Sequence, residues 1–183
     1  MTTCEADRQL LLALARGALE SRVTGRTIPA PGSSDVLARL AGAFVSLHKR
    51  GQLRGCIGHV EADEPLARVI ARCAVAAGSS DPRFTPVAPD ELRHIHIELS
   101  ILGPLETITS LADLEIGRHG LVVEMGWNRG LLLPQVATEW KWDRETFAAE
   151  TCRKAGLPPD GWTKGAALWR FEAEVFGEEI GER

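Results

Sequence analysis

The segment from His94 to Leu102 restricts the fold more than any other part of the sequence, because polar and apolar residues alternate there as far as Ile101. A period of two residues is typical of a β-strand that buries one face, so this segment predicts a strand. Two pairs of short apolar runs, each joined by a Gly-containing turn, predict antiparallel hairpins. These pairs are 41–48 with 53–60 and 121–125 with 130–133, and a last alternating run covers 167–176.

Three segments carry an apolar stripe at helical spacing and predict helices, and they are 4–22, 63–78 and 143–155. Asp63 and Asp143 are expected to cap the second and third helices, Gly78 to end the second, and Cys73 to lie on its inward face. Helices inserted between hairpins, instead of after every strand, favour an α+β fold over a doubly wound parallel sheet. We therefore expect a largely antiparallel sheet with flanking helices.

The chain has 183 residues, which fits a single domain over residues 1–183, either as one body or with two lobes. Its net charge of −4 argues against a protein that binds nucleic acid or anionic lipid through a basic surface. No apolar stretch approaches the ~18 residues typical of a spanning helix, and the first residues lack the basic and apolar regions of a signal peptide. We therefore expect a cytoplasmic protein.

Four scattered cysteines, at positions 4, 56, 73 and 152, predict reduced thiols and no disulfide scaffold or zinc ribbon. Cys56 stands out because Gly55 and Gly58 flank it inside a predicted strand, where glycine often marks the close approach of a ligand. Arg54, Cys56 and Gly58 share one face of that strand, and a guanidinium roughly 7 Å from the sulfur favours the thiolate. This pattern indicates a nucleophile. The alternative is a small buried cysteine between glycines that serve a bulge.

His119 and Glu98 are the candidate partners of this nucleophile. His119 precedes an apolar strand and is the best candidate for a base, with a structural histidine as the alternative. Glu98 lies in the middle of a strand, so it needs a cationic partner such as Arg83 or Arg129, unless its face is solvated. His94, His96 and Glu98 alternate as metal ligands can, but no further ligand or supporting group is recognisable, so we expect no metal and no cofactor.

Arg83 and Arg129 lie in connecting segments, where a guanidinium can clamp a carboxylate or a phosphate of an anionic substrate. The alternative is an ion pair that fixes a loop, and Asp81 is the obvious partner for Arg83. Gln135 begins a short helix after Pro134, whose amides can also meet an anion.

The hexapeptide Leu-Arg-Gly-Cys-Ile-Gly at 53–58 resembles the hallmark of the AMMECR domain family, also known as AmmeMemoRadiSam system protein A. Further blocks resemble that family in the same order, and they are 81–84, 97–104, 117–121, 129–137 and 154–157. The resemblance implies an α+β fold with two lobes around a cleft that the hexapeptide lines. It also implies a Memo-like protein and a radical SAM enzyme as partners, since their genes are often neighbours, but it implies no reaction.

Two functions fit these residues. The first is an enzyme or enzyme subunit that uses Cys56 as a nucleophile or covalent carrier, with His119 moving protons and Glu98 orienting or charging the site. Its substrate-binding residues would be Arg54, Gly55, Gly58, Arg83, Arg129 and Gln135. The second is a non-catalytic adaptor that binds a small ligand or a peptide in the same cleft. Motifs for nucleoside triphosphate hydrolysis and classical serine hydrolysis are absent from the sequence.

Overall fold

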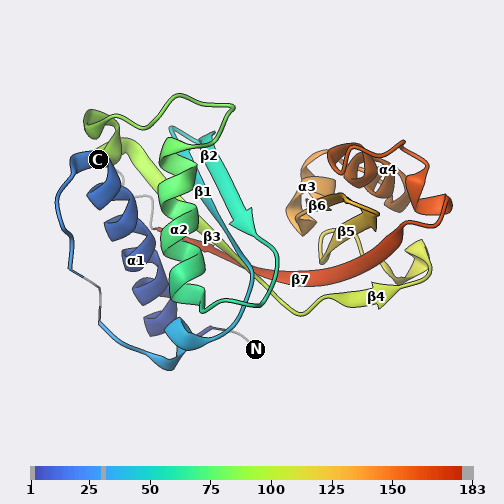
Figure 1. The fold of residues 1–183 in the computed structure, drawn as a ribbon, viewed down its shortest axis with the longest axis horizontal. Helices are drawn as coiled ribbons and strands as arrows, with labels where there is room; N and C mark the ends of the chain where they lie inside the picture. Colours follow the sequence, from blue (N-terminus) through green and yellow to red (C-terminus); the bar gives the residue numbers. More distant parts are fainter. Residues whose placement is uncertain (1–2, 30–31, 179–183) are drawn as a thin grey trace. The chain divides into compact units, whose positions relative to one another are not determined.

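The computed structural model describes residues 3–29 and 32–178, and Figure 1 shows its ribbon. The chain divides into two compact units. Unit 1 consists of the described residues up to Leu102 and those from Glu174 onward, and unit 2 consists of Gly103–Ala173. Strand β7 (Ala167–Gly177) contributes residues to both units, because its last four residues fall in unit 1.

Unit 1 contains a β-sheet with two helices over one of its faces (Figure 1). Strands β1 (Ala43–Lys49), β2 (Gln52–His59) and β3 (Ile95–Leu102) lie in the order β2-β1-β3, and both pairs are antiparallel. Helices α1 (Glu5–Thr24) and α2 (Leu66–Ser79) form the covering layer. Two 3₁₀ helices complete the unit, η1 (Asp35–Ala38) and η2 (Pro89–His94).

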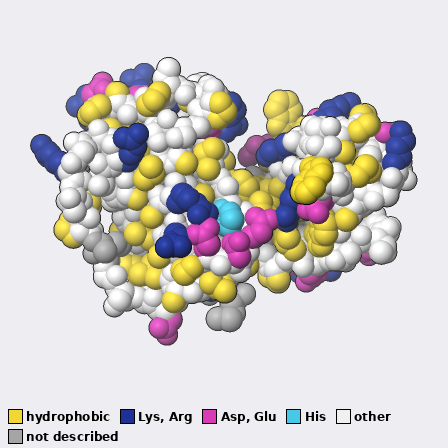
Figure 2. Space-filling model, in the orientation of Figure 1, with side chains coloured by type: hydrophobic (Ala, Val, Ile, Leu, Met, Phe, Trp, Pro, Cys, Tyr) yellow, Lys and Arg dark blue, Asp and Glu magenta, His cyan; other side chains and the backbone are white. Residues whose placement is uncertain are grey.

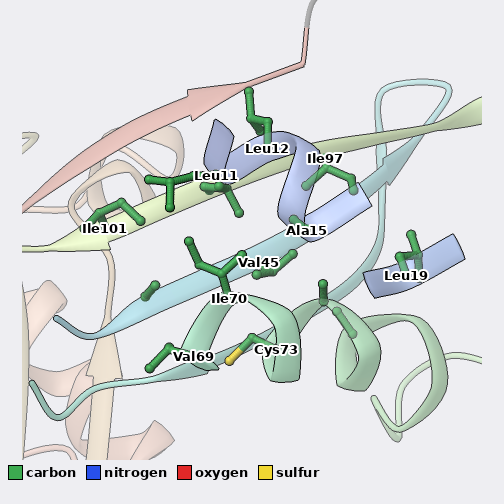
Figure 3. Close-up of a cluster of buried hydrophobic side chains, with 14 of the residues drawn as sticks. Leu11, Leu12, Ala15, Leu19, Val45, Val69, Ile70, Cys73, Ile97 and Ile101 are labelled. Carbon is green, nitrogen blue, oxygen red and sulfur yellow. The ribbon is translucent and has the colours of Figure 1, made fainter. Parts of the chain in front are cut away.

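The core of unit 1 lies between the helices and this sheet (Figure 3). Leu11, Ala15 and Leu19 repeat at helical spacing on α1 and are fully buried. Every second residue of β1 and β3 meets them from the sheet, including Val45 and Ile97. The core face of the sheet is therefore apolar, and the intervening residues of each strand point to the opposite face.

Unit 2 is built on the hairpin of β5 (His119–Met125) and β6 (Asn128–Leu132). The first part of β7 pairs antiparallel with both β5 and β4 (Glu106–Ile108). Helices α3 (Pro134–Glu139) and α4 (Arg144–Lys154) follow, with 3₁₀ turns η3 (Leu111–Asp113) and η4 (Gly161–Thr163). Phe147, Ala148 and Cys152 of α4 pack on Leu121 and Val123 in a separate core.

The antiparallel α+β fold is confirmed, as are both hairpins, the three helices and the final strand. Cys73 is buried on α2, and the Asp143 side chain caps α4 by accepting the Thr146 N–H, both as expected. β4 was not predicted, because three residues are too few to show a period. Within the described ranges, no helix has the length and apolar character needed to cross a membrane.

Several elements begin or end at other residues than predicted, and three of these differences concern residues named above. Asp63 does not cap α2, since the helix begins at Leu66 after Pro65 and the Asp63 carboxylate binds His59 at 2.7 Å instead. Gly78 does not end α2, which continues to Ser79. The glycine instead leaves room for the Leu19 side chain, which would lie 2.3 Å from a Cβ at this position. His94 belongs to η2 and not to β3.

Charged side chains are scattered over the face of the molecule shown in Figure 2. Dark-blue and magenta groups lie beside one another there, and basic side chains do not merge into one continuous surface. This agrees with the many ion pairs between arginine and glutamate or aspartate, such as Arg8 with Glu174 and Arg170 with Glu106.

Candidate functional site

The face of β1–β3 that points away from α1 and α2 carries polar and chemically active side chains. On this face Cys56, Ser46 and Glu98 lie side by side on β2, β1 and β3 and form one row. In a second row His48 lies opposite His96. These residues alternate with the apolar core residues, so the period of two places them together. The row of Cys56, Ser46 and Glu98 is the candidate functional site.

Ser46 lies between the two outer members of this row. Its hydroxyl donates to Cys56 Sγ at 3.3 Å, and Glu98 lies directly opposite it on β3. Ser46 is buried, whereas Cys56 and Glu98 are half-buried. Within the part of the chain that the structure describes, the Glu98 side chain forms neither an ion pair nor a hydrogen bond. Neither cation proposed from the sequence, Arg83 or Arg129, is its partner.

Asp81 and Arg83 bind the main chain of Cys56. The Cys56 N–H donates to Asp81 Oδ2 at 2.9 Å, and the Arg83 guanidinium donates to the Cys56 carbonyl at 3.3 Å. Asp81 is buried, and its hydrogen bonds with the Arg83 guanidinium hold the pKa of its carboxyl well below the usual range. Arg83 thus forms the loop-fixing ion pair with Asp81 that we gave as the alternative.

Arg54 does not take the position that its spacing predicts. A bulge shifts the register of β2 between the partners of Leu47 and His48, which places Arg54 as the extra residue. Its guanidinium binds Glu91 at 3.0 Å and the carbonyls of Thr85 and Pro86. Arg54 therefore holds the loop after α2 against β2, and its guanidinium forms an ion pair with Glu91 instead of facing the cysteine.

The two glycines of the hexapeptide serve packing. A Cβ on Gly55 would lie 2.2 Å from the Ala77 carbonyl oxygen of α2, and one on Gly58 would lie 2.2 Å from the Phe44 ring. Gly55 lets the helix approach the strand, and Gly58 lets the ring lie over the strand. The inference that they leave space for a ligand beside the sulfur is thus not supported by their surroundings.

The four cysteines are all free and differ in their surroundings. Burial raises the pKa of the Cys73 thiol to about 11, and burial also raises the pKa of Cys152. Cys4 is exposed, and its thiol donates to Asp7 at 3.2 Å, so a carboxylate faces the sulfur. Cys56 alone combines partial exposure with a hydroxyl that donates to the sulfur.

His119 belongs to unit 2, whereas Cys56 belongs to unit 1. It is the first residue of β5 and is buried, and its Nδ1 accepts the Glu115 N–H at 3.0 Å. Burial lowers the pKa of His119, and the nearby Arg170 and Arg118 add to this effect. Through its bond with Glu115 the ring closes the turn that precedes β5, which is what a structural histidine does.

Arg129 and Gln135 also lie in unit 2. The Arg129 guanidinium is 3.4 Å from Glu124 on the neighbouring strand of the hairpin. Gln135 lies in the first turn of α3, and its buried Oε1 has no hydrogen-bond partner among the described residues. With only six residues, α3 offers no helix terminus strong enough to define an anion site.

One group of metal-ligating side chains comes together in the described ranges, and it is not the alternation of His94, His96 and Glu98. Ligand atoms of His59, Asp63 and Glu64 lie within 4.8 Å of one another. They could meet a cation, but Arg72 already binds Glu64 at 2.6 Å and His59 already binds Asp63. His94, outside β3, does not continue the face that carries His96 and Glu98.

The sequence matches the family model described as AMMECR1 over residues 12–176. The chain belongs to the AMMECR1 family. A protein of Methanothermobacter thermautotrophicus is 46% identical over 182 residues, which cover 94% of this chain and 95% of that protein. Protein MJ0810 of Methanocaldococcus jannaschii is 42% identical over 173 residues, covering 90% and 86% of the two chains. The crystal structure of uncharacterized protein PH0010 from Pyrococcus horikoshii superposes with a TM-score of 0.86 at 41% identity, covering 92% and 90%.

Two of the blocks that resemble this AMMECR1 family meet in unit 1. The hexapeptide at 53–58 supplies Cys56, and the block at 81–84 supplies Asp81 and Arg83, which bind its main chain. Sequence reasoning missed Ser46, although the predicted hairpin alone would have placed it near Cys56 once its register was assigned. It also missed that Asp81 binds Cys56, because no short-range pattern connects residues on different elements.

Proposed function

We propose that this AMMECR1 protein is an enzyme, or a subunit of one, in which Cys56 acts as a nucleophile or covalent carrier for a small substrate. The observation that supports this most is the row of Cys56, Ser46 and Glu98 across three strands. A thiol reacts as the thiolate, and a hydroxyl that donates to the sulfur stabilises that charged form. The buried cysteines of the two cores, Cys73 and Cys152, have no comparable polar row.

In this role Cys56, Ser46 and Glu98 each have a separate task. Cys56 Sγ forms a bond to an electrophilic carbon of the substrate, while the bond to the leaving group breaks and that group departs with the electron pair. For the thiol to ionise, it must donate to the Ser46 hydroxyl while that hydroxyl turns to the Glu98 carboxylate opposite it on β3. The hydroxyl proton then passes to Glu98, the thiol proton takes its place, and Ser46 is left donating to the thiolate as it donates to the sulfur in the structure. Glu98 suits this task because its carboxylate has no competing ion pair in the described part of the chain. His119 as a second proton carrier, and a Memo-like protein and a radical SAM enzyme as partners, are further parts of this proposal.

A non-catalytic adaptor is the second candidate, and two observations favour it. The glycines beside Cys56 are accounted for by packing against Ala77 and Phe44. Arg83 and Arg129, from which we inferred an anionic substrate, each lie beside a carboxylate of the protein, as does Arg54. Both observations fit a binding surface that makes no covalent bond.

Reactivity of the thiol separates the two candidates. We expect Cys56 to be alkylated by iodoacetamide faster than a free model thiol at neutral pH, in a Cys4→Ser background that removes the exposed competitor. Peptide mass spectrometry measures the rate at each cysteine across a pH series. We expect Ser46→Ala to slow the reaction of Cys56 about tenfold, because a donor to the thiolate is lost.

Thr151→Ala is the matched control, since it removes a buried hydroxyl from α4 without touching Cys56. It should leave the labelling of Cys56 unchanged. If Cys56 reacts no faster than the model thiol, and Ser46→Ala does not change its rate at any pH of the series, the nucleophile is excluded and the adaptor is preferred.

A further inference from the structure

Strand β2 is the outer strand of the sheet in unit 1, so one of its edges has no neighbouring strand. The main-chain groups of Cys56 point to this edge, because its N–H and carbonyl both bind side chains outside the sheet. Cys56 and Ser46 are thus a non-hydrogen-bonded pair, the arrangement in which opposite side chains approach most closely. The contact between sulfur and hydroxyl depends on this arrangement.

Asp81 and Arg83 together replace the missing strand at this point. Asp81 Oδ2 accepts the Cys56 N–H at 2.9 Å and an Arg83 Nη2 hydrogen at 2.7 Å. Asp81 Oδ1 accepts the main-chain N–H and the Nε of Arg83 at 3.1 and 3.0 Å. Arg83 Nη2 reaches back to the Cys56 carbonyl. One acidic and one basic side chain therefore satisfy both main-chain groups of a single residue.

The burial of Asp81 shows how much this contact constrains the strand. Its side chain is only 2% exposed, and a buried carboxylate is costly unless donors surround it. The donors here come from Cys56 and Arg83 alone among the described residues. The carboxylate cannot leave Cys56 without losing a bond that nothing else replaces. The segment of β2 that carries the sulfur is thereby held in place.

We infer that Asp81 and Arg83 are positioning residues for Cys56: they hold its main chain on the open edge of β2 so that its sulfur stays against the Ser46 hydroxyl. This inference rests on the proposed function for its consequence in reactivity. The binding of Asp81 and Arg83 to the Cys56 main chain, which we call the clamp, is measurable without it. A shift of about 1 Å in a reacting group lowers rates by up to about a hundredfold.

The test uses Asp81→Asn in the full-length chain with the Cys4→Ser background, and two readouts. Amide hydrogen exchange at Cys56 reports the clamp, and the pH profile of its alkylation reports the position of the sulfur. We expect exchange to become at least about tenfold faster and the limiting alkylation rate to fall about tenfold. Arg83→Lys should retain more of both properties than Arg83→Gln, because a lysine still pairs with Asp81.

Asp143→Asn is the matched control, since Asp143 is also a carboxylate that accepts a main-chain N–H, from Thr146. It should change neither readout at Cys56. An Asp81→Asn variant that folds but keeps the wild-type exchange rate overturns the clamp. One with faster exchange but an unchanged alkylation profile overturns the positioning role. If wild-type Cys56 is itself unreactive, the proposed function fails and the exchange rate alone decides on the clamp.

Discussion

The packing around Cys56 depends on the absence of a Cβ atom from each of the two flanking glycines. Gly55 has no side chain because the main-chain carbonyl of Ala77 occupies the place of its Cβ. The neighbour is main chain and not the flexible end of a side chain, so it cannot move without shifting α2. The glycine before Cys56 is therefore a condition for packing α2 on β2.

We expect Gly55→Ala to lower the free energy of unfolding by about 3 kcal/mol, the upper part of the range for overpacking. Urea unfolding followed by circular dichroism measures the change. Gly161→Ala is the control, because its Cβ would lie 3.4 Å or more from its neighbours, which is ordinary contact. A Gly55→Ala variant as stable as the control would show that α2 adjusts without cost.

At the scale of elements, the loop between α2 and β3 is held to β1 and β2 by Glu91. Lys49 on β1 and Arg54 on β2 bind this carboxylate, which also accepts the Ala88 N–H. Hydrogen bonds from Arg54, Ala88 and Lys49 lower the pKa of Glu91 to about 2. This one side chain joins two strands to a segment that has no strand partner of its own.

The pH dependence of stability follows from that pKa. A carboxyl whose pKa is lower in the folded than in the unfolded chain stabilises the fold above the unfolded pKa, and this contribution is lost as the pH falls. We expect Glu91→Gln to be less stable than wild type at neutral pH, and the difference to shrink between about pH 4.5 and about pH 2. Urea titrations at several pH values measure it, and a constant difference would contradict the assignment.

The elements of this fold were predictable where a period repeats several times, as in β3 and α1. The candidate site was predictable only in part. Cys56 and Glu98 were singled out from the sequence, but Ser46 and Asp81 meet Cys56 through strand register and loop closure. Arg54 was misplaced because a single bulge changes which side chains share a face. The sequence could not show that Nδ1 of His119 accepts the Glu115 N–H, because both readings of this residue have the same pattern.

At the scale of the whole molecule, β7 connects the stability of the two units. Its first residues pair with β5 in unit 2, and at its other end Glu174 binds Thr3 and Arg8 in unit 1. Glu178, just after the strand, accepts the Ile97 N–H and binds Arg16. Unfolding of unit 2 therefore releases a strand on which unit 1 also depends.

We expect the two units to unfold in one transition. All five tryptophans lie in unit 2, so their fluorescence reports that unit, whereas the labelling of buried Cys73 reports unit 1. Phe147→Ala, in the core of unit 2, should cost about 3–5 kcal/mol and shift both probes equally. Leu99→Ala, in the core of unit 1, should do the same. Separate midpoints for the two probes would show that β7 does not couple the units.

The edge of β2 is covered by residues that follow it in the chain. A ribosome completes the β1–β2 hairpin before it has made Asp81, Arg83 and Glu91, so the nascent hairpin exposes an uncovered strand edge. During that interval the edge can pair with a strand of another nascent chain on the same polysome. The rate of translation through residues 60–91, and not the stability of the finished fold, sets how long the edge of β2 stays uncovered.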